Sequence, residues 1–98
     1  MISSLIIRPK AEEDIKEAYQ WYEKKLYGLG KDFLRSAEKG INKIRNNPQL
    51  CPIVYRNFRR ILIRRFLFCI FFIETPDKLV VLAVIHGRRD QKRWKGRE

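Results

Sequence analysis

The sequence is poor in the residues that build metal centres and disulfide scaffolds. It has two cysteines and one histidine among 98 residues. Cys51 and Cys69 lack the C-x-x-C spacing, and His86 alone cannot complete a zinc site with them. We therefore expect no metal ion, and nothing in the chain implies an organic cofactor. The two thiols are expected to be reduced and semi-buried; the alternatives are a disulfide between them or a reactive nucleophile.

Long hydrophobic runs are also missing. The apolar stretches at 66–73 and 79–85 are far shorter than the roughly 20 residues that a membrane-spanning helix needs. The N-terminus has no basic segment followed by a cleavable apolar one. We expect a cytoplasmic protein that does not bind membranes. Its hydrophobic content of 45% is enough for one globular domain over residues 1–98, ending in a basic tail at 86–98.

Acidic residues are scarce and unevenly placed. The chain has 22 Lys and Arg but only 11 Asp and Glu, a net charge of +11. Residues 1–50 contribute a net +3 and residues 51–98 a net +8. The second half is therefore expected to meet a negative partner, either nucleic acid, an acidic protein segment or both. A purely solubilising role for these charges is the alternative.

The first half of the chain has helical periodicity. Residues 3–8 form a short β-branched run, which predicts a first strand. Apolar residues then recur at helical spacing over 10–26, with acidic residues Glu12, Glu13 and Asp14 expected in the first turn. Gly28 to Gly30 break this helix. A second one follows and is stopped by Asn46-Asn47-Pro48, which predicts an antiparallel helical hairpin.

The second half has strand patterns. Strands are expected at about 58–64 and 67–74, although no local residue marks the turn between them. The segment from Thr75 to Lys78, with its proline, is a clear turn before a final strand at 79–85. The order predicts an α+β domain: an N-terminal strand and an αα-hairpin packed on one face of a mainly antiparallel sheet of about four strands.

Both faces of this sheet are expected to be apolar. Phe66, Phe68, Ile70 and Phe72 alternate with other large apolar side chains instead of polar ones. The final strand places Leu79, Val81, Ala83 and Ile85 on one face, and Val80, Leu82 and Val84 on the other. Because two helices cover one face only, the other requires either a partner protein or the chain's own basic tail.

Five segments in order resemble the RelE/ParE superfamily of type II toxin–antitoxin toxins. Residues 18–23 and 28–33 are similar to its "W-Y-E … G-L-G-x-x-F" signature, and 44–48 to "I-x-x-N-P". Residues 59–66 are similar to "R-R … R-F", and 81–90 to the last strand and its exit. The resemblance covers about residues 5 to 94. It implies the fold predicted above, a cognate small antitoxin as partner, and a hetero-oligomer in which the antitoxin covers the second apolar face.

The resemblance leaves two functions open. ParE-like toxins, which include plasmid stabilisation proteins, inhibit growth by acting on DNA gyrase. RelE-like toxins are metal-independent endoribonucleases that cut mRNA on the ribosome. RNA cleavage needs an acid, a base and cations for the phosphorane. The catalytic candidates, which apply only to a nuclease, are His86, Arg89 and Arg65. The candidates for binding a target or nucleic acid are Arg59, Arg60, Arg88, Arg93 and Trp94.

Each candidate has a plainer reading. His86 is also acceptable as a polar residue at a strand end. The tail around Trp94 can bind single-stranded nucleic acid, seat an acidic antitoxin peptide, or place Trp94 against the sheet. One departure favours the ParE-like branch: RelE-like enzymes carry an Arg after an aromatic residue in the third sheet strand, and here Phe68 is followed by Cys69.

Overall fold

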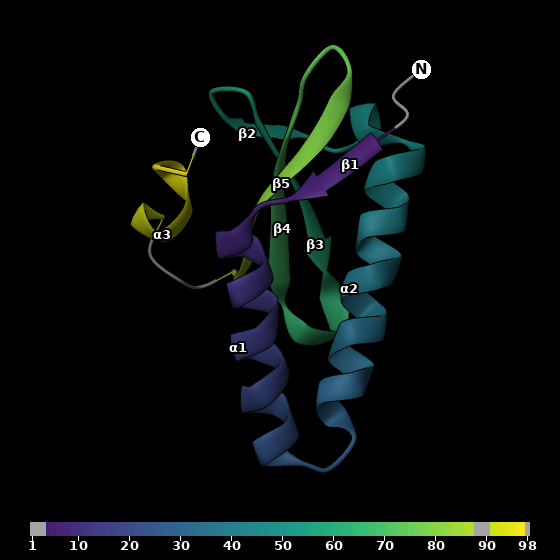
Figure 1. Ribbon diagram of the computed structural model, residues 1–98, viewed down its shortest axis with the longest axis vertical. Helices are drawn as coiled ribbons and strands as arrows, with labels where there is room; N and C mark the ends of the chain where they lie inside the picture. Colours follow the sequence, from purple (N-terminus) through teal and green to yellow (C-terminus); the bar gives the residue numbers. More distant parts are fainter. Residues whose placement is uncertain (1–3, 88–90, 98) are drawn as a thin grey trace.

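The protein is described by a computed structural model that covers residues 4–87 and 91–97 (Figure 1). Two long helices lie side by side against one face of a sheet, and a short helix near the C-terminus lies apart from them. The strands follow the order β1-β5-β4-β3-β2 across the sheet. The elements are β1 (Ser4–Ile7), α1 (Pro9–Lys25), α2 (Leu29–Asn46), β2 (Ile53–Tyr55), β3 (Phe58–Ile63), β4 (Phe68–Glu74), β5 (Lys78–His86) and α3 (Lys92–Lys95), with single 3₁₀ turns at Pro48–Leu50 and Arg64–Phe66.

The predicted α+β fold is confirmed, with one correction to the sheet. It is five-stranded and mixed, because β1 runs parallel to β5, with Ser4 opposite Lys78 and Ile7 opposite Val81. The other neighbouring pairs are antiparallel. A parallel neighbour needs a long crossover connection, and here the helical hairpin together with β2, β3 and β4 forms it.

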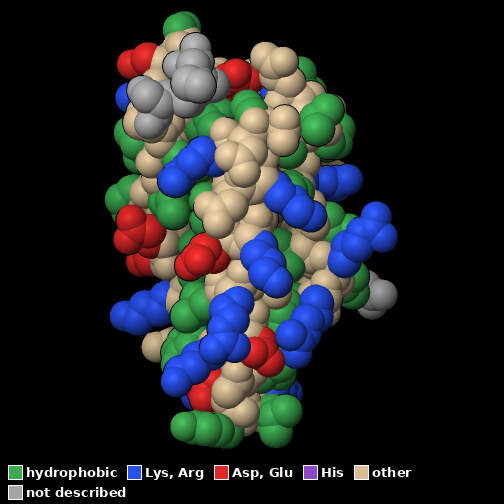
Figure 2. Space-filling view, turned by 90° about the vertical axis from the view of Figure 1, so that its right-hand side faces the viewer, with side chains coloured by type: hydrophobic (Ala, Val, Ile, Leu, Met, Phe, Trp, Pro, Cys, Tyr) green, Lys and Arg blue, Asp and Glu red, His purple; other side chains and the backbone are tan. Residues whose placement is uncertain are grey.

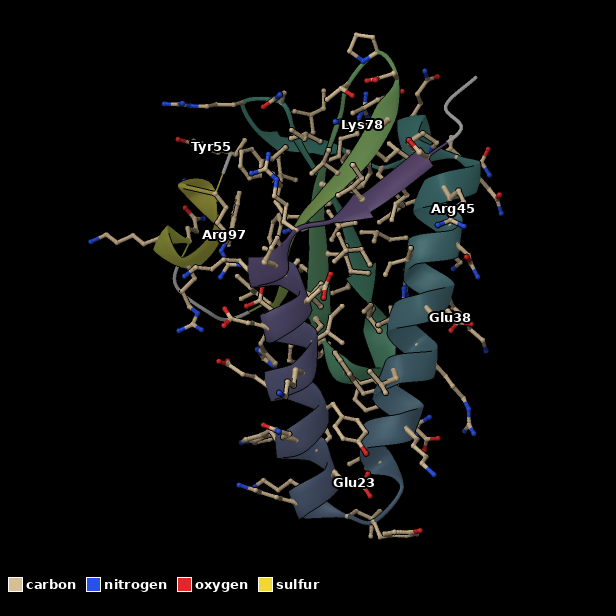
Figure 3. All side chains as sticks on the ribbon, viewed as in Figure 1. Glu23, Glu38, Arg45, Tyr55, Lys78 and Arg97 are labelled. Atoms are coloured by element: carbon tan, nitrogen blue, oxygen red, sulfur yellow. The ribbon has the colours of Figure 1, made fainter. Side chains whose placement is uncertain are left out.

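The turn between α1 and α2 shows the structural role of Glu23, Gly28 and Gly30, which belong to the signature segments 18–23 and 28–33. Gly28 has a φ of 87°, a left-handed conformation that glycine adopts without strain. The carboxylate of Glu23 accepts hydrogen bonds from the backbone N–H groups of Gly28 and Gly30, both at 3.0 Å (Figure 3). It thereby satisfies N–H groups at the start of α2 that lack helical partners, and places negative charge at the positive end of that helix.

The helices bury one face of the sheet. Ala11, Ala18, Phe33, Ala37 and Ile44 pack on it from α1 and α2. The strand residues on this face include those predicted for the 66–73 stretch, so that alternation is confirmed. They are Ile63, Phe66, Ile70, Phe72, Leu79, Val81 and Val84, with Phe68 at the edge of the cluster.

The predicted alternation in the last strand is wrong beyond Leu82. Phe72 pairs with Val81 and Phe71 with Ala83, so Leu82 is an extra residue that forms a bulge in β5. A bulge shifts the side-chain alternation by one position. Val84 therefore joins Leu79 and Val81 on the helix face, whereas Leu82, Ala83 and Ile85 lie on the other.

The second apolar face is covered by the chain itself. Trp94, on α3, is 7% exposed and packs with Phe58, Phe71 and the β5 residues of that face. The alternative in which the basic tail covers the sheet is therefore the one that the structure shows. The inference that this face needs a separate protein as cover is corrected accordingly.

The turn that no local residue marked lies where it was predicted. A single 3₁₀ turn, Arg64–Phe66, separates β3 from β4. Leu67 follows with a φ of 56°, a conformation that a leucine rarely adopts. Its carbonyl accepts a hydrogen bond from the Gly87 N–H at 2.8 Å, which ties the turn to the end of β5. Among the described residues, no helix is long and apolar enough to cross a membrane.

Candidate functional site

A cleft lies between α1 and the last part of β5. The pairing of β5 with β1 ends at Val81, although β5 continues to His86, so α1 takes the place of a neighbouring strand there. The cleft has a volume of about 390 Å³. Its lining combines acidic, basic and aromatic side chains. It consists of Asp14, Glu17, Ala18, Trp21, Tyr22, Phe68, Val84, Ile85, His86 and Arg93.

His86 lies in this cleft at the end of β5. It faces Phe68 across the strand pair, and the two rings meet edge to face with centroids 5.4 Å apart. The side chain is half-buried. Its position in an open cleft is compatible with both readings of His86, a proton-transfer group and a polar residue at a strand end.

Two aromatic residues of α1 line the cleft in different ways. Tyr22 is packed between Phe33, Phe66 and Phe68, and its hydroxyl donates to the Phe66 carbonyl at 3.3 Å. Burial raises the pKa of Tyr22, so it stays neutral near pH 7. Trp21, by contrast, is 56% exposed, with the Lys25 ammonium 4.8 Å from its ring centroid.

Trp21 was not among the residues predicted for the site. Its neighbours Ala18 and Tyr22 belong to the apolar stripe of α1, and Trp21 lies beside that stripe. A tryptophan outside the buried face of an amphipathic helix is the signal that would have identified it, because exposed tryptophans are enriched at protein interfaces.

Asp14 connects three parts of the fold at the floor of the cleft. Its carboxylate accepts a hydrogen bond from the Val84 N–H at 3.0 Å and an ion-paired one from Arg97. The same guanidinium donates to the Leu82 carbonyl at 3.2 Å. Figure 3 shows Arg97 extending from the C-terminal segment toward the start of α1. Asp14 thus satisfies a backbone group of β5 beyond the bulge, where β1 no longer pairs with that side of the strand.

Asp14 is buried, at 9% exposed, and its expected role at the helix dipole is corrected. Of the three acidic residues predicted for the first turn of α1, only Glu12 lies there. Asp14 shares a face with Ala11 and Ala18. A carboxylate within an apolar stripe at helical spacing indicates a buried polar contact, and that pattern was present in the sequence.

Two predicted site arginines are held by contacts within the chain. Arg65 forms an ion pair with Asp32 of α2 at 3.2 Å and lies over the Phe66 ring at 5.0 Å. Arg59 donates to the Cys51 carbonyl at 2.7 Å, with its Nε 3.9 Å from a carboxylate oxygen of Glu74. These contacts fix the loops on either side of β3, and the Arg59 side chain is only 20% exposed.

The predicted residues of the tail separate into two roles. Trp94 stacks on Phe71, with ring centroids 4.0 Å apart and planes 14° apart, so it is a core residue and not an exposed platform for a base. Arg93 is exposed and lines the cleft near His86. Arg60 is exposed on the sheet face that carries Cys69. Arg88 and Arg89 lie outside the described residues.

The cysteines are buried and show no feature of a reactive site. Burial raises the pKa of Cys51 and of Cys69, and the charges of Arg59 and Arg60 respectively oppose that rise without cancelling it. Both thiols are free. Within residues 4–87 and 91–97 no group of His, Cys, Asp and Glu side chains is arranged to hold a metal ion.

The family model for the ParE toxin of the type II toxin–antitoxin system, parDE, matches residues 5–91. No curated protein matches the sequence. Among solved structures, one described as the chromosomal ParDE TA system from P. aeruginosa matches with a TM-score of 0.66 and 16% identity, over 87% of this chain and 96% of that one. At this identity the likeness shows a shared fold. Because the family model spans most of the sequence, the chain belongs to the ParE toxin family of type II toxin–antitoxin systems, within the RelE/ParE superfamily.

Proposed function

We propose that the protein inhibits growth by binding a DNA-topology enzyme such as DNA gyrase, and that a cognate antitoxin neutralises it. In this proposal the toxin acts in the cytoplasm, forms a hetero-oligomer with its antitoxin and performs no catalysis. The observation that carries the proposal is Cys69. It stands where the nuclease branch of the superfamily is expected to carry a phosphate-binding arginine, and it is 3% exposed between Leu62 of β3 and Ile85 of β5.

The contacts of Arg65 support the same proposal. A nuclease needs a cation close to the acid–base groups, because the charge of the phosphorane develops there. Arg65 instead pairs with Asp32 of α2, whereas His86 lies in the cleft beside α1. The exposed Trp21 and the mixed lining of that cleft favour contact with a protein segment.

One observation supports the alternative, a RelE-like endoribonuclease that cuts mRNA on the ribosome. Burial raises the pKa of Cys69 and the charge of Arg60 opposes that rise, so a cation lies near the position where the nuclease branch is expected to carry an arginine. His86 and Arg93 line one open cleft. These residues leave a proton-transfer group and cations in reach of an RNA strand.

A single induction experiment separates the two functions. The chain is expressed without an antitoxin, and three quantities are followed from the first minutes: supercoiling of a reporter plasmid, induction of the SOS response, and the 5′ ends of cellular mRNA. We expect loss of negative supercoiling and SOS induction while transcripts stay intact. Transcripts cut within codons, with normal supercoiling, would contradict the proposal and establish the alternative.

A variant of His86 makes the test sharper. His86→Gln keeps a polar side chain but removes the imidazole, the group that would transfer protons in a nuclease. We expect the variant to retain growth inhibition if the toxin acts by binding, and to lose it if His86 transfers protons. Circular dichroism and thermal unfolding of the purified variant serve as the control for folding. Purified toxin is also expected to inhibit gyrase supercoiling in the absence of ribosomes.

A further inference from the structure

The solvent-facing side of α2 carries a regular stripe of cations. Basic residues recur at every fourth position, and all of them are exposed: Lys31, Arg35, Lys39 and Lys43. Residues four apart lie on the same side of a helix, about 6 Å apart along its axis. The opposite side of α2, with Phe33, Ala37 and Ile44, is buried against the sheet. The stripe therefore lies on a well-supported helix and faces solvent.

Few carboxylates compensate this stripe. Within the part of the chain that the structure describes, its one ion pair joins Arg35 to Asp32 at 3.2 Å, and the Arg35 side chain is still 73% exposed. Asp32 also pairs with Arg65, so its charge is shared by two guanidinium groups. The whole of α2 has five basic and two acidic residues, a net charge of +3, whereas α1 has four and five, a net charge of −1. The view that faces α2 shows Lys and Arg side chains spread along this side of the molecule (Figure 2).

The composition of the stripe does not suit a protein or lipid partner. Lysine is depleted at protein interfaces, which are anchored by buried apolar and aromatic side chains. Three of the four cations are lysines, and the exposed residues beside them include Asn42 and Asn46. Leu34, at 39%, is the one large apolar residue of α2 that is exposed. A helix that binds lipid inserts its apolar side, and that side of α2 lies in the core.

The phosphate backbone of duplex DNA fits these features better. It carries one negative charge per roughly 1.7 Å of its axis, so a row of cations meets phosphates along its whole length. Asparagine side chains also donate hydrogen bonds to phosphate oxygens. A single strand is held by aromatic side chains that stack on its bases, and the aromatic residue of α2, Phe33, is fully buried. The major groove of duplex RNA is too narrow for side chains, whereas that of B-DNA admits a helix.

We propose that the exposed side of α2 binds the phosphate backbone of duplex DNA without sequence specificity. The four cations of the stripe pair with phosphates, and Asn42 and Asn46 donate hydrogen bonds to them. This binding goes beyond the proposed growth inhibition and does not depend on it, since the residues that line the His86 cleft come from α1, β4, β5 and α3. A toxin held in this way on DNA would meet a DNA-topology enzyme at the place where that enzyme works.

The test measures the affinity of the purified full-length protein for a fluorescent DNA duplex of about 20 base pairs by anisotropy, with salt raised from about 50 to 200 mM. The variant Lys31→Gln/Lys39→Gln removes two charges from the stripe. The control Lys16→Gln/Lys24→Gln removes two exposed lysines from α1 with the same spacing along the helix. Single-stranded DNA and duplex RNA of the same length, and polyglutamate of the same charge, are the competing probes.

We expect a dissociation constant of about 1–100 μM near physiological salt, equal for duplexes of unrelated sequence. The stripe variant should bind about tenfold more weakly at low salt, and its slope of log affinity against log salt should be smaller by about 2. The α1 control should change affinity less than twofold. Glu38→Gln removes a carboxylate that neighbours Arg35 on the helix surface, so it should tighten binding about twofold.

Three results would overturn the proposal. The first is an equal loss of affinity in the α1 control, because the net charge of the protein would then explain the binding. The second is binding of single-stranded DNA or duplex RNA that is as tight as that of duplex DNA. The third is displacement of the duplex by polyglutamate at an equal concentration of charge, which would assign the stripe to an acidic protein. Circular dichroism of each variant excludes misfolding as the cause of a lost signal.

Discussion

The indole ring of Trp94 lies parallel to the phenyl ring of Phe71, with their centroids 4.0 Å apart. Phe71 belongs to the sheet face that α1 and α2 do not cover. The stacking therefore joins the C-terminal segment to the centre of the sheet. Phe58 and Tyr55 surround the same indole at centroid distances of 5.6 and 5.9 Å.

Substitution of Trp94 should destabilise the protein strongly. Trp94→Ala is expected to lower the free energy of unfolding by about 3–5 kcal/mol, because it removes a large buried side chain and leaves a cavity over Phe71. Trp94→Phe should cost less, roughly 1–2 kcal/mol, since a smaller ring can still stack. Urea unfolding followed by circular dichroism measures both values.

The matched control for this prediction is Trp21→Ala. Trp21 is 56% exposed, so its removal should change stability by about 0.5 kcal/mol or less. Equal effects of the two tryptophan substitutions would show that the tail does not serve as a cover for the sheet in solution.

The contact between Asp14 and Arg97 should contribute measurably to stability. Asp14→Ala leaves the Val84 N–H and the Arg97 guanidinium without their acceptor, at an expected cost of about 2–4 kcal/mol. A double-mutant cycle with Arg97→Gln should give a coupling energy of about 1–3 kcal/mol. Glu13→Ala, an exposed neighbour on α1, is the control. Additive effects of the two substitutions would argue against the ion pair.

Gly30 should not tolerate a side chain, although it lies in a helix. Alanine is favoured over glycine in helices by about 1 kcal/mol. A Cβ at Gly30, however, would lie 2.7 Å from the Tyr19 carbonyl oxygen of α1. We expect Gly30→Ala to destabilise the protein by about 1–3 kcal/mol. At Gly96 the added Cβ meets nothing within 4 Å, so Gly96→Ala should be nearly neutral. Thermal unfolding of both variants compares them, and a more stable Gly30→Ala would refute the close contact.

The burial of the two free thiols predicts that they react slowly with alkylating reagents in the folded protein. Burial raises the pKa of Cys51 and Cys69 above the ordinary 9.0, so both thiols are protonated in the folded protein at pH 8. Alkylation by iodoacetamide at this pH should be much slower in the folded than in the unfolded protein, because both thiols are buried and the thiolate is the nucleophile. Rapid labelling without unfolding would show that a thiol is accessible.

The raised pKa values of Cys51 and Cys69 also predict how the stability of the fold changes with pH. The thiols ionise at lower pH in the unfolded chain than in the folded one, so their contribution is complete below about pH 9 and is lost as the pH rises above it. The free energy of unfolding should therefore decline more steeply above pH 9 in the natural protein than in a Cys51→Ala/Cys69→Ala variant. Parallel declines in the two proteins would assign the effect to other groups.

The helices and the α+β class could be predicted because their signals are local. Pro9 begins α1, and Gly28, with its left-handed backbone, is the N-cap of α2. No local residue marked the turn at Arg64–Phe66 in the sequence, and the structure shows why: Leu67 takes the left-handed conformation for which sequence patterns expect glycine or asparagine.

The parts that could not be predicted depend on contacts between distant residues. The parallel pairing of β1 with β5 has no local signature, and neither has the bulge at Leu82 that reverses the alternation in β5. For the site, the sequence identified His86 and Arg93, which line one cleft. It missed Asp14 and Trp21, whose roles follow from the packing of α1 against β5.

The pairing of β1 with β5 also determines when the sheet can be completed during synthesis. Ser4 finds its neighbour only at Lys78, and Asp14 finds its ion-pair partner only at Arg97. The helical hairpin contains mostly local contacts and can form early, but β5, which joins β1 to the rest of the sheet, is synthesised after all the other strands. The His86 cleft, which requires β5 beside α1, therefore cannot form before β5 has been synthesised.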